Sequence, residues 1–314
     1  MKKIRLALLS GGVSSEREVS LSSGEEVFKA LDKEKYEITR YDPKFDLKQL
    51  TLDADHIDAA LIILHGPFGE DGTIQGMLDL LGIPYQGAGV LGSAIAMDKL
   101  LSKQLYTQHD IPTPDYLGFY RHDAIDIDHC IAVLDLPMVI KPVSAGSSVG
   151  MTIVKSKQEM QGAIDLAFEQ DQALIMEKYI KGMELTCGVL GNEDLEALPV
   201  IEIIPGDAHE FFDYHAKYVP GATEEICPAR IDDDLTRQVQ HLAVEAHKVL
   251  KLDGYSRTDM ILDNGRLHVL ETNTIPGMTA TSLYPQSAEV AGYSFTRILD
   301  RLIELGMERN NTTP

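Results

Sequence analysis

The sequence contains no tryptophan, few other aromatic residues and only three cysteines among 314 residues. Cys130, Cys187 and Cys227 lie far apart in the chain, and no CxxC spacing occurs. An odd and scattered set of cysteines is typical of reduced thiols in the cytosol rather than of a disulfide framework. We therefore expect an intracellular protein without structural disulfides.

Long apolar runs and an excess of positive charge are also missing. No stretch approaches the ~20 apolar residues that span a bilayer. The short apolar run after Lys2 and Lys3 ends in a glycine turn rather than in a cleavage site, which argues against a signal peptide. The formal net charge of -21 disfavours nucleic acid and anionic membranes as partners. These absences predict a cytoplasmic protein with neither kind of partner.

Apolar residues are nevertheless plentiful, because they make up 44% of the chain and allow a sizeable core. The length predicts about two domains. Apolar runs at Ile4–Leu9 and Ala59–Leu64 predict strands, and we expect another strand at Tyr36–Tyr41. Helical spacing follows at Val27–Leu31 and Ile74–Leu81. This alternation predicts a parallel sheet flanked by helices over roughly the first hundred residues.

The pattern changes after a helix that we expect over Ala94–His109. Pro112 and Pro114 then mark a linker, since a proline disfavours helix in the residue before it. The remainder has α+β character. It predicts strands at Met138–Lys141, Thr152–Lys155 and Ala173–Glu177 and within Val189–Pro205 and Tyr255–Asn273, with helices at Gln158–Phe168 and Leu235–Leu250.

Two apolar strands around Asp263, Asn264 and Gly265 predict a β-hairpin rich in acids. The length of its turn decides which side chains share a face. A two-residue turn at Asn264 and Gly265 would place Asp259 and Glu271 on opposite faces of the sheet. A three-residue turn with Gly265 left-handed would bring them to the same face, and we expect this second register.

In the expected register Leu262 pairs with Arg266. Arg257 then lies opposite Glu271, Asp259 lies opposite Val269, and Asn273 shares their face. Oxygen ligands of this kind suit Mg²⁺, which is usually held by a few carboxylates together with substrate phosphates. An ordinary surface hairpin with solvated charges is the alternative. The Pro-Gly turn within 274–279 favours a site, because it brings backbone N–H groups to the same end of the hairpin.

Glycine-rich loops follow three of the expected strands. The loop at Lys141–Met151 has the small residues that let a backbone close over phosphates, although a flexible turn explains it equally well. The loops at Ser10–Ser20 and His65–Gly72 should meet at the carboxyl edge of the parallel sheet, where such sheets bind ligands. We interpret Glu70 and Asp71 as acids that favour the start of the next helix.

Taken together, these segments resemble the D-alanine–D-alanine ligases of the ATP-grasp superfamily over nearly the whole chain. The resemblance is carried by GGVSSEREVSLSSG, HGPFGEDG, GSAIAMDK, KPVSAGSSVGM, EKYIKGMELT, FFDYHAKY and SRTDMILD…LETNTIPGMTATSLYP. It implies an N-terminal parallel-sheet domain followed by a two-part ATP-grasp fold. The implied boundaries are 1–98 for the N-terminal substrate-side α/β domain, 99–178 for the central ATP-grasp subdomain, and 179–314 for the C-terminal subdomain with the metal and substrate site.

The resemblance also implies ATP and two Mg²⁺ ions, with Mn²⁺ as an alternative. The ligands of the metals would be Asp259, Glu271 and Asn273, with Glu271 shared. The groups that hold the phosphates, adenine and ribose of ATP would be Lys99, Lys141, Ser148, Glu177, Lys178, Tyr179, Ile180 and Glu184.

The remaining implied roles concern catalysis and the two D-alanine molecules. The catalytic groups would be Glu16, Ser147 and Tyr218 as a hydrogen-bonded trio, Lys217 at the γ-phosphate, and Arg257 with the Gly277 N–H at the tetrahedral intermediate. Ser282 and Leu283 would receive the second D-alanine, and His65 would lie near the first. Residues 211–218 would form a loop that closes over the reactive acylphosphate.

The implied reaction is ATP-dependent formation of D-alanyl-D-alanine through D-alanyl phosphate, for peptidoglycan precursors, by a homodimer. Three rivals stay open: another D-amino acid or D-lactate as second substrate, another ATP-grasp carboxylate–amine ligase, and a non-catalytic relative. Tyr218 favours the dipeptide, since ester-forming relatives usually have phenylalanine there. Departures from the family pattern at Ala145, Thr258 and Arg230 remove none of the implied catalytic groups.

Overall fold

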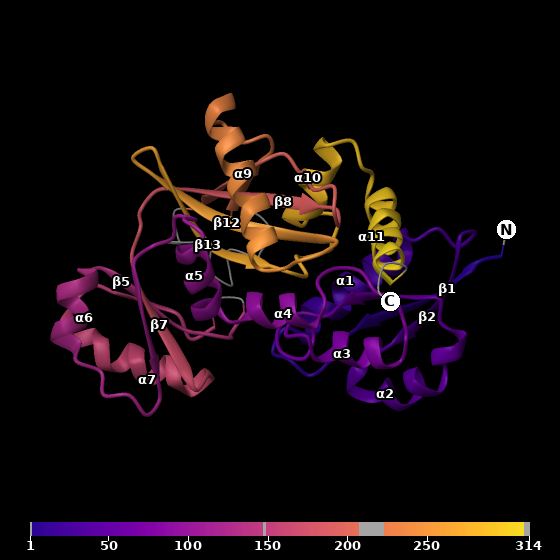
Figure 1. Cartoon of the computed structure of the whole chain (residues 1–314), viewed down its shortest axis with the longest axis horizontal. Helices are drawn as coiled ribbons and strands as arrows, with labels where there is room; N and C mark the ends of the chain where they lie inside the picture. Colours follow the sequence, from indigo (N-terminus) through magenta and orange to yellow (C-terminus); the bar gives the residue numbers. More distant parts are fainter. Residues whose placement is uncertain (1, 147–148, 207–222, 311–314) are drawn as a thin grey trace.

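The computed structural model describes residues 2–146, 149–206 and 223–310 of the chain. Three parts lie around a central gap in the ribbon, an N-terminal part, a central part and a C-terminal part (Figure 1). Among the residues described, no helix is both long enough and apolar enough to cross a membrane. The predicted site residues Ser147, Ser148, Lys217 and Tyr218 and the predicted closing loop 211–218 fall outside this range.

The N-terminal part is a parallel sheet of β2 (Tyr36–Tyr41), β1 (Ile4–Ser10) and β3 (Ala59–Ile63), in that order. Strands β1 and β3 are buried on both faces, as their continuous apolar runs predict, whereas β2 lies at the edge of the sheet and is partly exposed. Leu6 and Leu8 pack into one core cluster, while Ala7 and Leu9 pack into another on the opposite face. Around it lie α1 (Arg17–Ala30), α2 (Pro43–Leu52), a 3₁₀ turn (Ala54–His56) and α3 (Thr73–Leu80).

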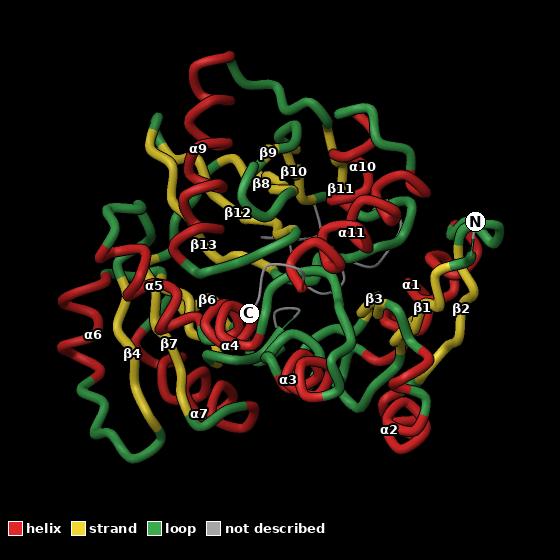
Figure 2. The backbone as a smooth tube through the Cα atoms, turned by 45° about the vertical axis from the view of Figure 1, so that its right-hand side comes forward, coloured by secondary structure: helices red, strands yellow, loops and turns green. Residues whose placement is uncertain are grey.

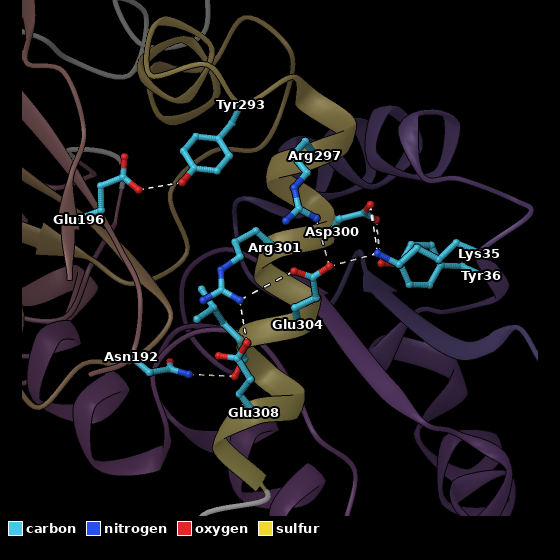
Figure 3. A network of polar contacts seen from close by, with 11 residues as sticks. Lys35, Tyr36, Asn192, Glu196, Tyr293, Arg297, Asp300, Arg301, Glu304 and Glu308 are labelled. Carbon is cyan, nitrogen blue, oxygen red and sulfur yellow. Dashed lines mark hydrogen bonds and ion pairs between the residues drawn. The ribbon is translucent and has the colours of Figure 1, made fainter. Parts of the chain in front are cut away.

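The C-terminal helix α11 (Phe295–Asn310) returns to this sheet and buries Ile298 and Leu302 against it. Polar contacts fix the helix at the start of β2 (Figure 3). Lys35 Nζ lies 3.1 Å from Asp300 and 3.2 Å from Glu304, and the Tyr36 hydroxyl donates to Asp300 at 2.7 Å. The last helix of the chain therefore fastens the C-terminal part to the first sheet.

The central part is an antiparallel sheet in the order β4-β7-β5-β6. The alternating side chains of β5 divide between a core and a cleft, since Met138 and Ile140 pack under the helices while Val139 and Lys141 face the cleft. The elements are β4 (Tyr116–Tyr120), α6 (Ile127–Leu134), β5 (Met138–Pro142), β6 (Thr152–Val154), a 3₁₀ turn (Lys157–Glu159), α7 (Met160–Gln170) and β7 (Ala173–Lys178).

The C-terminal part is a second antiparallel sheet, in the order β11-β10-β8-β12-β13 with β9 beside β8. Helix α9 (Asp233–Val249) covers one face of this sheet, as Figure 2 shows, and the other face is turned to the cleft. The other elements are β8 (Met183–Leu190), β9 (Glu196–Ala197), β10 (Ile201–Pro205), β11 (Thr223–Ile226), β12 (Tyr255–Asp263), β13 (Arg266–Asn273) and α10 (Leu283–Val290).

A single helix over Ala94–His109 was the expectation, and it is wrong. The structure has α4 (Val90–Met97) and α5 (Lys99–Gln108), separated by the extended residue Asp98. The Asp98 carboxylate accepts a hydrogen bond from Leu101 N–H at 2.8 Å and so caps the second helix. The break places Lys99 at the first turn of α5.

Candidate active site

The β12–β13 hairpin turns at Asn264 and Gly265, whose φ angles are 46° and 79°. Asp263 pairs with Arg266 and Leu262 with Leu267, so the turn has two residues. The expected three-residue turn and the pairing of Leu262 with Arg266 are therefore wrong. The physical reason is that two left-handed residues match the twist of the flanking strands, and Asn-Gly adopts them readily.

A β-bulge restores the shared face of Asp259 and Glu271, which a two-residue turn alone would have placed on opposite faces of the sheet. Met260 pairs with Val269, yet the next pair is Asp259 with Glu271, so Leu270 is an extra residue on β13. Leu270 and Glu271 consequently both line the cleft. Asp259 lies opposite Glu271 rather than Val269, and Arg257 lies opposite Asn273 rather than Glu271.

The Asp259 carboxylate is the most densely bonded group on this face. It accepts hydrogen bonds from Arg257 Nε at 2.9 Å and Nη2 at 2.8 Å, from Thr186 Oγ1 at 2.6 Å and from Asn273 Nδ2 at 3.1 Å. Fork-shaped contacts of arginine with a carboxylate fix geometry as well as charge. The three predicted metal ligands are thus gathered with Arg257 on one sheet face.

Glu271 is approached from α5. Lys99 Nζ lies 3.6 Å from the Glu271 carboxylate and donates to the Ala145 carbonyl at 2.9 Å. Lys99 therefore joins the hairpin to the glycine-rich loop after β5. Lys99, for which the resemblance implies a place at the ATP phosphates, thus lies beside both the loop and the acidic hairpin.

The donor set suits a hard cation. Within the described ranges no group of three or more His, Cys, Asp and Glu side chains is arranged to hold a metal. Two carboxylates and one amide leave several coordination positions to phosphate and water, which is the usual arrangement for Mg²⁺. The oxygen chemistry of Asp259, Glu271 and Asn273 accordingly fits magnesium together with a phosphorylated ligand.

A cleft between the central and C-terminal sheets holds the predicted nucleotide residues. Lys141 reaches its edge from β5, and Leu270, which the sequence reasoning missed, lies on the hairpin side. Burial alone would lower the pKa of Lys141, but Glu177 and Glu271 beside it raise that pKa above its ordinary value. The predicted residues on the wall are Lys99, Lys141, Glu177, Lys178, Tyr179, Ile180 and Glu184.

A second cavity lies between the N-terminal loops and the end of the hairpin. Both loops predicted at the carboxyl edge of the parallel sheet contribute to it, through Glu16 and His65. Lys99, Ala145 and Glu271 line this cavity as well as the nucleotide cleft, so the two spaces meet there. The predicted residues on its wall are Glu16, His65, Arg257, Asn273, Gly277, Ser282 and Leu283.

The floor of the second cavity holds titratable groups that are almost free of solvent. Burial lowers the pKa of His65 in spite of the nearby Glu16 carboxylate. His65 Nε2 has no hydrogen-bond partner among the described residues. A buried polar atom of this kind is rarely left unsatisfied, so it points to a ligand or water at that position.

Glu70, which is partly exposed, lines the same cavity, and its interpretation as a helix-starting acid is wrong. Its carboxyl accepts hydrogen bonds from Gly66 N–H at 2.7 Å and Ile275 N–H at 3.3 Å instead of meeting α3. Burial, and then the charge of Glu16, raise the pKa of Glu70 to about 8. Asp71 does serve the helix start, since it accepts from Thr73 N–H at 2.9 Å.

The loop between β13 and α10 closes the far end of this cavity. The Ser282 hydroxyl accepts from Thr279 N–H at 3.1 Å, and the Ala280 N–H donates to Glu26 on α1 at 2.9 Å. The loop that carries Ser282 is therefore held by a residue of the N-terminal part.

Comparison with known proteins identifies this arrangement. The family model described as D-ala D-ala ligase C-terminus matches residues 105–304, and D-ala D-ala ligase N-terminus matches residues 41–88. A D-alanine–D-alanine ligase of Syntrophobacter fumaroxidans is 57% identical over 307 residues, covering 98% of this chain and 99% of the relative. One of Desulfotalea psychrophila is 54% identical over 311 residues, covering 98% and 97%.

The solved structure of a D-alanine–D-alanine ligase from Bacillus anthracis complexed with ATP has a TM-score of 0.87 and 37% identity, covering 98% of this chain and 99% of that one. A parallel-sheet part followed by two antiparallel sheets that enclose a cleft is the ATP-grasp arrangement, and the predicted fold is confirmed. Within that class, the chain belongs to the D-alanine–D-alanine ligase family.

The two-residue turn can be tested by substitution. Gly265→Val should lower the free energy of unfolding by about 1–2 kcal/mol, because a β-branched residue resists a positive φ. Asn264→Gly should change it by less than about 0.5 kcal/mol, because glycine accepts the same left-handed conformation. Urea unfolding measures both. An equal loss in the two variants would contradict the two left-handed positions.

The partly buried Glu70 carboxyl makes a prediction about pH. Below about pH 8 it is neutral, whereas above that pH it places a second negative charge beside Glu16. That charge would repel the D-alanine carboxylate and the ATP phosphates that must meet at the junction of the cavities. kcat/KM for the first D-alanine should therefore fall as pH rises through 8. Glu70→Gln should remove this fall, because its amide stays neutral. Comparing the two pH profiles cancels the ionisation of D-alanine itself, and superimposable profiles would refute the assignment.

Proposed function

We propose that this chain joins two D-alanine molecules into D-alanyl-D-alanine at the expense of ATP, through a D-alanyl phosphate. The observation that carries the proposal is the meeting of the two cavities at Lys99 and Glu271. A nucleotide in one cavity would present its terminal phosphate to an amino acid carboxylate in the other. A carboxylate becomes reactive toward an amine only after such activation.

The nucleotide side supplies position and positive charge, which phosphoryl transfer needs more than covalent help. Lys99 and Lys141 lie where the phosphates would enter the junction. Asp259, Glu271 and Asn273 would hold two Mg²⁺ ions, with Mn²⁺ as a substitute. Such ions neutralise phosphate charge when bound. The adenine and ribose would lie along 177–180 and Glu184.

The first D-alanine would bind in the second cavity with its ammonium group at Glu16. Because Glu70 is neutral below about pH 8, the pair carries one negative charge, which matches one ammonium group. His65 Nε2 supplies a further polar contact. The Arg257 guanidinium and the Gly277 N–H, both on the cavity wall, would stabilise the oxyanion of the tetrahedral intermediate.

The second D-alanine would place its carboxylate at Ser282 and Leu283. These two residues form the N-cap and first position of α10, and the first turn of a helix favours an anion. Its amine would then face the acylphosphate at the junction of the cavities. Tyr218, Ser147 and Lys217, and Ser148 at the phosphates, retain the roles that the family resemblance implies.

Several wider expectations belong to the same proposal. The ligase would act in the cytoplasm, as a homodimer, in the synthesis of peptidoglycan precursors. Its domains would divide at 98/99 and 178/179. The return of α11 to the first sheet adds a C-terminal segment to the packing of the N-terminal domain. Reduced cysteines agree with the location, since Cys130 and Cys187 are free and buried.

The reaction is tested by phosphate release with D-alanine, L-alanine, D-lactate and other D-amino acids. D-alanine should give ADP, phosphate and the dipeptide, and L-alanine should give none. The Asp259→Ala, Glu271→Ala double variant should lose turnover by at least about a hundredfold while its circular dichroism stays unchanged. Preference for D-lactate at neutral pH would overturn the substrate, and retained turnover would overturn the metal ligands.

The loop that receives the second D-alanine gives a separate prediction. Glu26→Ala removes the acceptor of the Ala280 N–H, so KM for the second D-alanine should rise about threefold to tenfold, as expected for a hydrogen bond worth about 1 kcal/mol. KM for ATP should not change.

The matched control is Glu25→Ala on the same helix. Glu25 makes ion pairs only with Lys29 and Arg40 among the contacts described, so its loss should leave both KM values within about twofold. Equal effects of the two substitutions would show that the tether to Ala280 plays no part in substrate binding.

A further inference from the structure

Helix α5 carries two lysines one turn apart, Lys99 and Lys103, which therefore lie on the same helix face. Lys99 meets Glu271 at the junction of the cavities. The Lys103 side chain has no exposed surface at all. A buried ammonium group is costly unless it is paired, so its partners indicate why it is there.

Lys103 Nζ lies 2.9 Å from Glu177 Oε1 and donates to Thr113 Oγ1 at 2.5 Å. The Thr113 hydroxyl in turn donates to the Val269 carbonyl at 2.8 Å, directly before the bulge residue Leu270. Lys103 is thus anchored between β7 and the hairpin strand that shapes the site.

The second oxygen of Glu177 is shared with the nucleotide cleft. Glu177 Oε2 lies 2.8 Å from Lys141 Nζ, and the Glu177 side chain is only 4% exposed. Burial alone would raise the pKa of Glu177, but Lys103 and Lys141 hold it below its usual range. Burial lowers the pKa of Lys103, and the Glu177 carboxylate opposes that shift. A separation of 2.9 Å is typical of a charge-assisted contact.

The three charges form a row of cation, anion and cation with a net charge of one positive unit. If Lys103 were removed, the charges of Glu177 and Lys141 would neutralise each other. The edge of the nucleotide cleft would then lose its excess positive charge. Glu271 is the next acid that faces the row, and Lys99 approaches it at 3.6 Å. In the weakly screened interior of a protein, a change of one charge unit strongly alters the interaction with a nearby charged group.

We propose that Lys103 is a positioning residue for the nucleotide. It binds Glu177 and offsets the negative charge of that side chain, so that the positive charge of Lys141 remains available to the phosphates of ATP. The inference deepens the proposed function and rests on it. Lys103 touches neither substrate, since it acts through Glu177. The four-residue spacing of the two lysines on α5 is the sequence signal for it, and only the contacts with Glu177 and Thr113 show that Lys103 is buried.

The test measures ADP binding by calorimetry on the full chain, without D-alanine. Lys103→Met replaces the ammonium with an unbranched apolar side chain and should raise the Kd for ADP at least about tenfold. KM for ATP should rise in parallel, and KM for D-alanine should stay within about twofold. An unchanged Kd for ADP would overturn the inference.

A second variant separates charge from packing. Lys103→Met combined with Glu177→Gln removes the buried acid as well, so Lys141 regains its uncompensated charge. The comparison is with Glu177→Gln alone, because Glu177 itself belongs to the nucleotide site. In that background Lys103→Met should change the Kd for ADP by less than about threefold. If Lys103 were only a packing residue, Lys103→Met would weaken ADP binding equally in both backgrounds. The double variant buries no unpaired acid, so it still tests the inference if Lys103→Met alone does not fold, and a Kd more than about threefold weaker than that of Glu177→Gln would then overturn the inference.

Wild-type binding distinguishes this inference from the proposed function. If the wild-type chain binds ADP and Lys103→Met binds it equally well, the role of Lys103 fails and the ligase function stands. If the wild-type chain binds no ADP, the proposed function fails first. Thr113→Val is the matched control, because it removes the anchoring hydroxyl and keeps the ammonium group. It should leave the Kd within about threefold, and a loss as large as that of Lys103→Met would contradict the charge argument.

Discussion

One extra residue on β13 determines which way the acids of the hairpin face. Along a regular strand, side chains alternate between the two faces of the sheet. The bulge at Leu270 interrupts this alternation once, so Leu270 and Glu271 both reach the cleft while Val269 and Thr272 stay buried. Asp259 consequently meets Glu271 across the hairpin, and the second cavity meets the nucleotide cleft at this point.

Burial decides how the charges around that hairpin behave. The Arg257 fork and Thr186 hold Asp259 in one orientation. Deeper inside, the charge of a buried acid must be offset or removed. Glu177 keeps its charge because two lysines flank it, whereas Glu70 retains its proton up to about pH 8 because burial and the charge of Glu16 outweigh the opposing charge of Lys99. This agrees with the proposal that one cavity receives phosphates and the other an amino acid.

The sequence predicted features that depend on local pattern. Apolar runs predicted strands β1 and β3, and the loops after them do meet at one edge, where Glu16 and His65 share a cavity. The shared face of Asp259 and Glu271 was predicted for the wrong reason. The turn has two residues, and a bulge that no residue type announces restores the facing.

The missed features depend on tertiary contacts. Glu70 stands where a helix-starting acid would stand, and only the hydrogen bond from Ile275, far away in the sequence, shows its other role. Lys103 resembles any helix lysine until Glu177 and Thr113 close around it. The periodicity of the sequence likewise does not reveal that Asp98 is extended and caps α5. Burial and register, rather than residue type, separate these residues from ordinary surface groups.

The central claim is that Asp259, Glu271 and Asn273 form one cation-binding face beside the nucleotide. Counting bound Mn²⁺ by electron paramagnetic resonance in the presence of ADP tests this claim most directly. The account predicts that the wild-type chain binds Mn²⁺ with ADP, and that Glu271→Gln weakens this binding at least about tenfold without unfolding the chain. Unchanged Mn²⁺ binding in that variant would contradict the account, because the metal would then lie elsewhere.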